Sequence, residues 1–402
     1  MAIFDKYQDD LTSGKKFVLG IQHMFTMFGA TVLIPFLLGL NASVTLFLMG
    51  VGTLCFHLVT KGKVPVFLGS SFAFVSPILA ITATYGILYA HGGLVIVGVI
   101  YMVLALVIYV FGVDKVVSFF PPVVVGPIII CIGMGLAPAG VGMSSDNWFL
   151  AIVTGIIIVI VALFTKGFFK MIPVMCGLAG GYIVALVTGN VDFAPVGAAA
   201  WVGLPPFVFG KFDMGAILII APIALVTAVE HIGDIAANSA VTGRKYMADP
   251  GLHRTMLGNG IATAISGFFG GPAATTYSEN TAVLALTRVY NPVVMRTAAC
   301  GAIVLGIIPK LGAIISTIPL GVSGGAFFLL CGMIAAVGLR TLVENGVDFK
   351  KTRNVFIASI ILTIALGGAV IDVGNFHLSS LAIATVVGLI LNKAIPDRPE
   401  AA

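Results

Sequence analysis

Three carboxylic acids lie inside long apolar stretches of the chain: Glu230, Asp234 and Glu279. An ionisable group in hydrocarbon costs about 2.5 to 3.5 kcal/mol on insertion scales, so such residues usually face a cavity and mark the pathway of a substrate or an ion. Lys and Arg are absent from these stretches except at their ends. Glu230 and Asp234 are four residues apart and therefore share one face of a helix. These acids could accept hydrogen bonds from a ligand or bind a proton.

Three ionised acids in a low-dielectric site are unfavourable, so we expect at least one of them to hold a proton. Asp234 is the first candidate for this proton-coupling group, and His23 and Glu230 are the others. His23 follows Gln22 in the first apolar stretch, where it could serve the pathway or pack between helices. The His and acidic residues lack the spacing of a metal site, so no metal or other cofactor is predicted.

The composition places these residues in a membrane. Of the 402 residues, 59% are hydrophobic and only 9% are charged, whereas soluble proteins carry about 25% charged residues. The net charge of +5 is too thinly spread to form a nucleic-acid-binding face. The 49 Gly show no triplet period, which excludes a collagen-like chain. The five Cys lie in apolar runs without a C-x-x-C motif and are predicted to be packing residues.

A helix needs about 20 apolar residues to cross a bilayer, and fewer where the span is broken and protected by protein. The sequence predicts an all-α polytopic membrane protein with fourteen transmembrane segments. They lie near residues 17–40, 44–59, 64–82, 92–112, 121–139, 148–165, 171–188, 214–238, 255–270, 277–288, 292–308, 312–338, 354–371 and 379–392.

The distribution of positive charge supports this count. With a cytoplasmic N-terminus, all of the 21 Lys and Arg except Lys211 and Lys310 fall on the cytoplasmic side. Both termini are therefore predicted to be cytoplasmic. The first apolar run follows the polar residues 1–16 and has no A-x-A cleavage site, so we interpret it as a retained span and not as a signal peptide.

Seven spans in each half imply an inverted repeat, because an odd number makes the second half begin on the opposite side. The third segment of each half is interrupted, at residues 69–74 in the first half and 275–280 in the second. Paired interrupted segments indicate a transporter binding site near the midplane, where helix ends offer free N–H groups. Phe72 and Tyr277 occupy equivalent places there and could hold a flat ring, or simply pack.

Several motifs together carry a resemblance to a known family. They are Gln22-His23 with residues 27–32 (MFGATV), 61–63 (KGK), 68–74 (LGSSFAF), 230–233 (EHIG), 249–254 (DPGLHR) and 279–288 (ENTAVLALTR). The last motif has the form of a family signature through Glu279, Asn280, Thr287 and Arg288. On these motifs, which cover nearly the whole chain, the protein resembles the nucleobase-ascorbate transporters, and among them the bacterial uracil permeases.

The resemblance implies two inverted repeats that form a core domain and a gate domain, with substrate bound between them. The expected core comprises residues 1–116 (spans 1–4) and 191–309 (spans 8–11). The expected gate comprises residues 117–190 (spans 5–7) and 310–402 (spans 12–14 and a cytoplasmic tail). The resemblance also implies the bacterial cytoplasmic membrane as location and a homodimer formed through the gate domains.

Carried over by position, the implied substrate-binding residues are Phe72, Ala73, Glu230, Tyr277, Ser278 and Glu279. The two glutamates would accept hydrogen bonds from the base, and the two aromatic residues would flank its ring. The backbone near Phe72 and Ser278 would donate to its carbonyls. Uracil fits this pattern because its ring has two N–H donors and two C=O acceptors.

Three residues depart from the uracil permease pattern. Ala282 replaces the signature Gly, Ser278 stands where Gly is usual, and Asp234 stands where the best-known uracil permease has His. An acid at position 234 also resembles purine-transporting relatives, so a xanthine or urate symporter is the alternative. We favour uracil because the signature begins with Glu279, whereas the purine branch typically begins with Gln.

The sequence thus predicts a symporter that imports a nucleobase, most simply uracil, with protons by alternating access. Sodium is the alternative coupling ion, because carboxylates and carbonyls also bind hard cations. A passive facilitator or channel is a second class, in which the acids would line a cation path. An anion transporter fits less well because the midplane is acidic. An enzyme is not predicted, because no nucleophile–base pair or metal site is evident.

Overall fold

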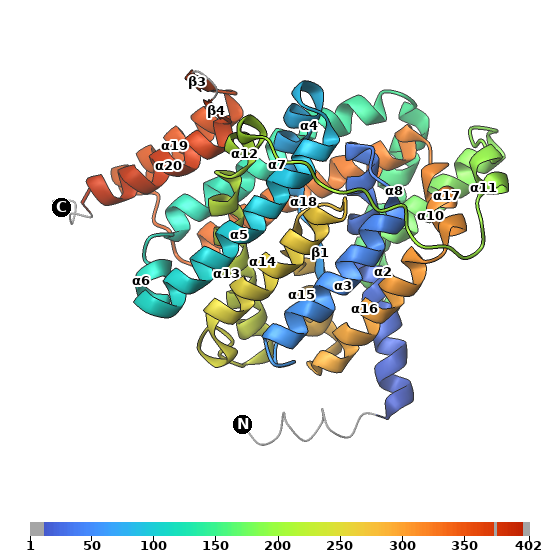
Figure 1. The fold of residues 1–402 in the computed structure, drawn as a ribbon, viewed down its shortest axis with the longest axis horizontal. Helices are drawn as coiled ribbons and strands as arrows, with labels where there is room; N and C mark the ends of the chain where they lie inside the picture. Colours follow the sequence, from blue (N-terminus) through green and yellow to red (C-terminus); the bar gives the residue numbers. More distant parts are fainter. Residues whose placement is uncertain (1–11, 374–375, 397–402) are drawn as a thin grey trace.

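The structure is a computed structural model that describes residues 12–373 and 376–396 (Figure 1). Most of the polar N-terminal stretch, residues 1–11, and the end of the predicted cytoplasmic tail, residues 397–402, lie outside the described residues.

The described chain is mostly helical. Its first half contains α2 (Ser13–Leu38), α3 (Ala42–Val59), β1 (Leu68–Ser70), the 3-10 turn η1 (Phe72–Phe74), α4 (Val75–Thr84), α5 (Ile87–Phe111), α6 (Val113–Val117), α7 (Pro122–Ser144), α8 (Trp148–Phe164), α9 (Phe168–Met171), α10 (Pro173–Val187) and α11 (Ala194–Ala198). Its second half contains α12 (Met214–Ile220), α13 (Ile223–Thr242), the π-helical turn η2 (Met247–Gly251), α14 (Leu252–Phe268), β2 (Ala274–Thr276), α15 (Ser278–Thr287), α16 (Pro292–Gly306), α17 (Pro309–Ser316), α18 (Leu320–Glu344), α19 (Thr352–Leu366), β3 (Ile371–Val373), β4 (Phe376–Leu378) and α20 (Ser380–Ala394).

Many of these helices are apolar enough to cross a membrane. Six are also long enough by themselves, when α12 and α13 are taken as one: α2, α3, α5, α7, α12–α13 and α18. Five more apolar helical segments have 10–17 residues. Because lipid offers no hydrogen bonds to the backbone, helices are the form in which such segments cross it. The protein is therefore a multi-pass membrane protein.

The predicted twelfth span, residues 312–338, differs from the structure. The helix α17 ends at Ser316, and α18 begins at Leu320 and continues to Glu344. Pro319 lies between them and fixes the start of α18, because proline disfavours helical geometry in the residue before it. The helix α17 is instead bent by 82° from α16. The predicted span therefore combined the end of α17 with part of α18, because the apolar sequence continues across the break between them.

The two interrupted segments meet in a small antiparallel ladder, which corrects the all-α prediction locally. Leu68 pairs with Thr276, Gly69 with Thr275 and Ser70 with Ala274. The ladder is extended at its ends by the N–H of Ser71, which donates to the Ala273 carbonyl at 2.9 Å, and that of Tyr277, which donates to the Phe67 carbonyl at 3.1 Å. A second short pair, β3 with β4, joins α19 to α20.

Threonine hydroxyls complete the outer edges of the β1–β2 ladder. On one side, the Leu68 N–H donates to Thr53 Oγ1 of α3 at 3.0 Å, and this hydroxyl donates to the Leu68 carbonyl. On the other side, the Ala274 N–H donates to Thr263 Oγ1 of α14 at 3.2 Å, and this hydroxyl donates to the Ala274 carbonyl. The strand edges thus have the partners that a buried backbone requires.

The long helices pack in two groups (Figure 1). In one group, α5 packs on α14, and α3 packs on both α14 and α16, with α2 beside α16. In the other group, α7 packs on α18 and α19, and α8 packs on α10 and α18. Fewer contacts join the groups, among them α2 with α10. The helix α13 contacts both sides, through α5 and α14 on the one and through α7 and α20 on the other.

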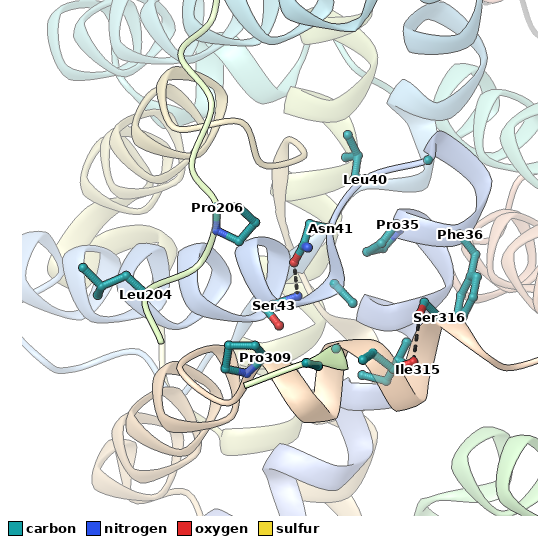
Figure 2. Close-up of a pocket in the computed structure, with 15 residues that line it drawn as sticks. Pro35, Phe36, Leu40, Asn41, Ser43, Leu204, Pro206, Pro309, Ile315 and Ser316 are labelled. Carbon is teal, nitrogen blue, oxygen red and sulfur yellow. Dashed lines mark hydrogen bonds between the residues drawn. The ribbon is translucent and has the colours of Figure 1, made fainter. Parts of the chain in front are cut away.

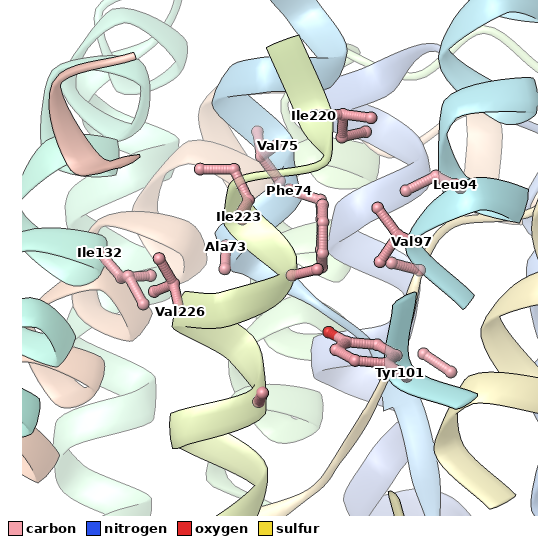
Figure 3. Close-up of a cluster of buried hydrophobic side chains, with 14 of the residues drawn as sticks. Ala73, Phe74, Val75, Leu94, Val97, Tyr101, Ile132, Ile220, Ile223 and Val226 are labelled. Carbon is pink, nitrogen blue, oxygen red and sulfur yellow. The ribbon is translucent and has the colours of Figure 1, made fainter. Parts of the chain in front are cut away.

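Apolar packing fixes the first interrupted segment in place. Phe74 of η1 is fully buried, and it belongs to a cluster with Leu94 and Val97 of α5 and with Ile223 and Val226 of α13 (Figure 3). In a membrane protein such side chains stabilise the fold by close van der Waals packing. The start of α4 is therefore held against the helices that border the acidic residues.

Candidate functional site

The three acids come together where α13 meets the start of α15. Glu230 and Asp234 lie on α13, and Glu279 lies in the first turn of α15. The helix α13 contacts α15, β2 and η1, so both interrupted segments border the acids. All three acidic side chains are half-buried.

Asp234 has a partner on each of its two carboxylate oxygens. The hydroxyl of Thr276 donates to Oδ2 at 2.5 Å, and the hydroxyl of Ser278 donates to Oδ1 at 2.8 Å. Both donors belong to the second interrupted segment, one at the end of β2 and one at the start of α15. Asp234 therefore links α13 to the point at which this segment changes from strand to helix.

Glu230 differs from Asp234 because one of its oxygens is unpartnered. Its Oε2 is buried and accepts no hydrogen bond from the described residues. An unsatisfied buried acceptor costs about 1 to 3 kcal/mol, and more when it is charged. A ligand that brings an N–H donor to this oxygen would remove that cost.

Glu279 lines a cavity of about 170 Å³ between the two packing groups. One wall comes from α2 and α15, with Thr26, Ala30 and Glu279 among its residues. The other comes from the segment around α9 and α10 and from α18, with Lys170 and Met333 among its residues. Glu230 and Asp234 do not line this cavity, so Glu279 is the one of the three acids that borders it.

The start of α15 supplies backbone donors beside the acids. The first N–H groups of a helix have no partner within the helix, and they lie at its partially positive end. In α15 these are the groups of Ser278, Glu279 and Asn280. The site can therefore accept hydrogen bonds through carboxylates and donate them through the backbone.

The two aromatic residues of the interrupted segments have different environments. Phe72 is half-buried, and its ring stacks with that of Phe327 from α18, with centroids 5.9 Å apart. Tyr277 is only 4% exposed. Its hydroxyl donates to the Ser70 carbonyl and accepts from Thr31 Oγ1, both at 3.2 Å. Phe72 thus lies at the junction of the packing groups, whereas Tyr277 anchors the ladder.

Gly69 explains how Tyr277 fits so closely against β1. A Cβ atom built on Gly69 would lie 2.1 Å from the Tyr277 ring. Any other residue at this position would collide with the ring, because such contacts are far shorter than packed atoms allow. The first interrupted segment therefore needs glycine here for contact with the second.

A larger cavity lies elsewhere in the molecule. It has a volume of about 600 Å³ and is formed by the end of α2, the start of α3, the loop containing Leu204 and Pro206, and α17 (Figure 2). None of the three acids lines it. Among residues 12–373 and 376–396, no group of three or more His, Cys, Asp or Glu side chains is placed to hold a metal ion.

Comparison with known proteins identifies the family to which the chain belongs. Residues 14–374 match the sequence profile of a family described as "Permease family". A protein named "Probable uracil permease" from Haemophilus influenzae is 44% identical over 95% of this chain and 94% of its own length. The chain belongs to the nucleobase-ascorbate transporter family. Members of this family are permeases and not enzymes.

A second relative and a solved structure extend the comparison. A "Uracil permease" from Bacillus caldolyticus is 44% identical over 98% of this chain and 95% of its own length. The transmembrane domain of a cyanobacterial bicarbonate transporter has a TM-score of 0.67, with 15% identity and coverage of 94% of this chain and 96% of that chain. The nucleobase-ascorbate transporter therefore has a polytopic transporter fold.

The signature residues of this nucleobase-ascorbate transporter lie at the two ends of α15. Asn280 is buried, and its Nδ2 group lies 3.1 Å from both the carbonyl oxygen and Nδ1 of His23. Thr287 and Arg288 lie at the other end of α15, where the hydroxyl of Thr287 bonds the Val283 carbonyl. His23 of α2 is thus buried against the signature Asn of α15, a position that fits packing between helices as well as a role beside the pathway.

Sequence reasoning missed the hydroxyl groups that organise the site. Thr31, Ser70 and Thr276 all bond to predicted site residues. The signal in the sequence for Ser70 and Thr276 was the concentration of Ser and Thr in the two interrupted segments, whereas Thr31 of α2 had no such signal. It was weak, because such residues also occur in ordinary turns.

Proposed function

We propose that the protein is a secondary active symporter that imports uracil together with protons across a bacterial cytoplasmic membrane. The observation that carries this proposal is the buried, unpartnered Oε2 of Glu230 beside the start of α15, where Glu279 and the first N–H groups of that helix also lie. The uracil permeases to which the chain is similar over nearly its whole length support the choice of base.

The chemistry of uracil matches the donors and acceptors of this site. Each glutamate accepts one ring N–H, and the N–H groups at the start of α15 donate to a ring carbonyl. Phe72 covers one face of the ring, with Ala73 next to it. Tyr277 acts mainly by holding β1 and β2 in register. The two bonds to the glutamates contribute about 1.5 to 3 kcal/mol each, and the backbone bonds and stacking add to them towards the about 8 kcal/mol that micromolar binding needs.

For the architecture, we propose fourteen spans in two inverted repeats. The matched roles of Thr53 and Thr263 at opposite edges of the β1–β2 ladder support this symmetry. The two packing groups support a core domain at residues 1–116 and 191–309 and a gate domain at residues 117–190 and 310–402. Both termini are cytoplasmic in this arrangement, and two protomers associate through their gate domains.

For transport, we propose that core and gate move against each other. The cavity between them connects Glu279 with Lys170, which the charge distribution places on the cytoplasmic side. A base bound at the acids would leave through this cavity. Among the candidates for the coupled proton, Asp234 comes first, followed by His23 and Glu230. Neutralising one acid lets the loaded site move with less unpaired charge.

The experiment is a binding measurement on purified protein with uracil, xanthine and urate, followed by uptake into proteoliposomes. We expect uracil to bind most tightly and to accumulate against its gradient. Tighter binding of xanthine or urate would favour the purine symporter, to which Asp234 points. Uptake that never exceeds equilibrium under any ion gradient would make the protein a facilitator or channel.

A further inference from the structure

The connection between α10 and α12, residues 188–213, is rich in apolar residues. Charge is confined to Asp192, Lys211 and Asp213. We call this connection the outer segment, because the proposed topology places it on the side of the membrane opposite the cytoplasm. It contains the short helix α11, and Figure 1 shows it running from there across the molecule to α12.

Large apolar side chains of the outer segment are exposed. Trp201 is 73% exposed and Leu204 is 78% exposed. Single exposed apolar residues are common on protein surfaces, but a group of them in one connection indicates contact with lipid or with another protein. The other large apolar residues that are exposed here are Phe193, Val202, Val208, Phe209 and Phe212.

Backbone hydrogen bonds fix the depth of the outer segment. The N–H of Gly203 donates to the Ile307 carbonyl at 3.1 Å, at the residue where α16 ends. The N–H of Lys211 donates to the Leu88 carbonyl at 2.9 Å, in the first turn of α5. In the proposed topology, both helices cross the membrane with these ends on the outer side. The outer segment therefore lies across the outer ends of two spans, where the bilayer meets water.

The helix α17 and the end of α14 agree with this depth. The helix α17 is bent by 82° from α16, so it runs close to the membrane plane if α16 crosses the membrane. The N–H of Lys310 in α17 donates to the Ala200 carbonyl at 3.1 Å. Further along the outer segment, the ring of Phe209 packs on that of Phe268, the last residue of α14, with centroids 5.5 Å apart. The outer segment thus follows the membrane surface from α17 to α14.

Trp201 and Lys310 form a pair that suits the headgroup layer of a membrane. Lys310 Nζ lies 4.6 Å from the centroid of the Trp201 ring, which is a cation–π contact. Tryptophan is enriched where membrane meets water because its ring is amphipathic, and lysine places its ammonium group in the polar layer on an apolar stem. Lys211 and Lys310 are also the two cations that the charge distribution places on the outer side. Phosphate groups of lipids would be suitable partners for both.

We propose that the outer segment is a lipid-binding surface of the transporter. Trp201 and Leu204 lie at the boundary between headgroups and acyl chains, and Lys211 and Lys310 face the phosphates of the outer leaflet. The partner is a phospholipid surface and not a second copy of the chain, because the outer segment is bonded to α5 and α16 of the core group, whereas the proposed protomer contact is in the gate domain. The inference uses the proposed topology and goes beyond the proposed function, since it does not depend on the substrate.

Tryptophan fluorescence tests this placement, because Trp148 and Trp201 are the only tryptophans in the chain. The variant Trp148→Phe leaves Trp201 as the single fluorophore. The variant Trp201→Phe leaves Trp148, which begins α8 at the outer end of a predicted span and is the matched reference. Each protein is placed in phosphatidylcholine vesicles whose acyl chains carry bromine either near the headgroup or near the chain end. Acrylamide is the quencher in the water phase.

We expect bromine near the headgroup to quench Trp201 at least as strongly as Trp148, and more strongly than bromine near the chain end does. Strong quenching of Trp201 by acrylamide with little quenching by brominated lipid would place this residue in water. Protection from both quenchers would mean that protein covers it, as in a contact between two copies. Either result, or equal quenching from both bromine positions, would overturn the inference.

Melting temperatures show whether the two variants are folded. If Trp148→Phe does not fold, the difference between the wild-type protein and Trp201→Phe gives the quenching of Trp201. The wild-type protein is also titrated with uracil. Failure of the folded protein to bind uracil would overturn the proposed function and would leave the result on the outer segment unaffected.

Discussion

Replacing Glu230 by Gln should abolish most of the affinity for uracil while leaving the protein folded. The substitution keeps the size of the side chain and removes its charge. Because Glu230 Oε2 has no partner among the described residues, no internal hydrogen bond depends on this oxygen. An effect on binding would therefore come from the ligand contact itself.

The expected loss has two parts. A hydrogen bond to a charged acceptor contributes about 1.5 to 3 kcal/mol, and leaving the ring N–H buried against an NH2 donor costs about 1 to 3 kcal/mol more. A total of roughly 3 kcal/mol or more corresponds to a loss of at least about 100-fold in Kd. The stability of the ligand-free protein should rise or stay the same. The reason is that a neutral amide replaces a buried acid that lacks a full set of hydrogen-bond partners.

Calorimetric titration with uracil measures the affinity, and thermal unfolding without ligand measures the stability. Glu344→Gln is a suitable control, because Glu344 lies at the end of α18 with an exposed side chain and only a 4.0 Å ion pair to Arg340. Such a surface pair contributes little, so both readouts should stay at the wild-type level. Wild-type affinity in Glu230→Gln would refute the assignment of this acid to the base.

The other predictions concern the second acid, the moving parts, the ladder and the coupling ion. Glu279→Gln should lose uracil affinity by a similar factor, and an unchanged affinity would remove this residue from the site. Gln22 of α2 contacts Met171 of α9, so a disulfide between cysteines placed there, in a chain without its native cysteines, should block uptake until it is reduced. Full uptake with the disulfide formed would contradict motion between core and gate. Gly69→Ala should lower stability by about 1 to 3 kcal/mol and impair uptake, because its Cβ would lie 2.1 Å from the Tyr277 ring; a wild-type melting temperature would argue against that contact. An inward proton gradient should drive uracil accumulation in proteoliposomes, whereas accumulation that is driven by sodium at equal pH and is unaffected by a pH gradient would exclude proton coupling.

The sequence was most informative where a local pattern carried the answer. The runs of small and hydroxyl residues at 69–74 and 275–280 identified both interrupted segments, because a regular apolar helix rarely contains such runs. The pairing of β1 with β2 could not be predicted, because it joins residues about 200 positions apart and depends on how α3 and α14 present their threonines. The break before α18 was hidden for a different reason, since apolar residues continue on both sides of Pro319.

For the site, sequence reasoning identified the acids but not their partners. Glu230 and Asp234 stand out because charge is rare in lipid, and this holds without knowledge of the fold. The bonds from Thr276 and Ser278 to Asp234 need the exact placement of α15 against α13, which no periodicity encodes. Tyr277 was expected to flank a ring, yet its burial and its bonds to β1 arise from the close approach allowed by Gly69.

The β1–β2 ladder also constrains the order in which the chain can be completed during synthesis. Ser70 pairs with Ala274, so its strand lacks a partner until 204 further residues have been made. At about 5 to 20 residues per second, the first interrupted segment waits roughly 10 to 40 seconds for the second. During that interval its backbone groups need another partner, such as water, lipid headgroups or a membrane chaperone, because hydrocarbon offers none. The N-terminal half on its own therefore cannot reach its final form, and separately expressed halves should be protected from degradation only when both are present.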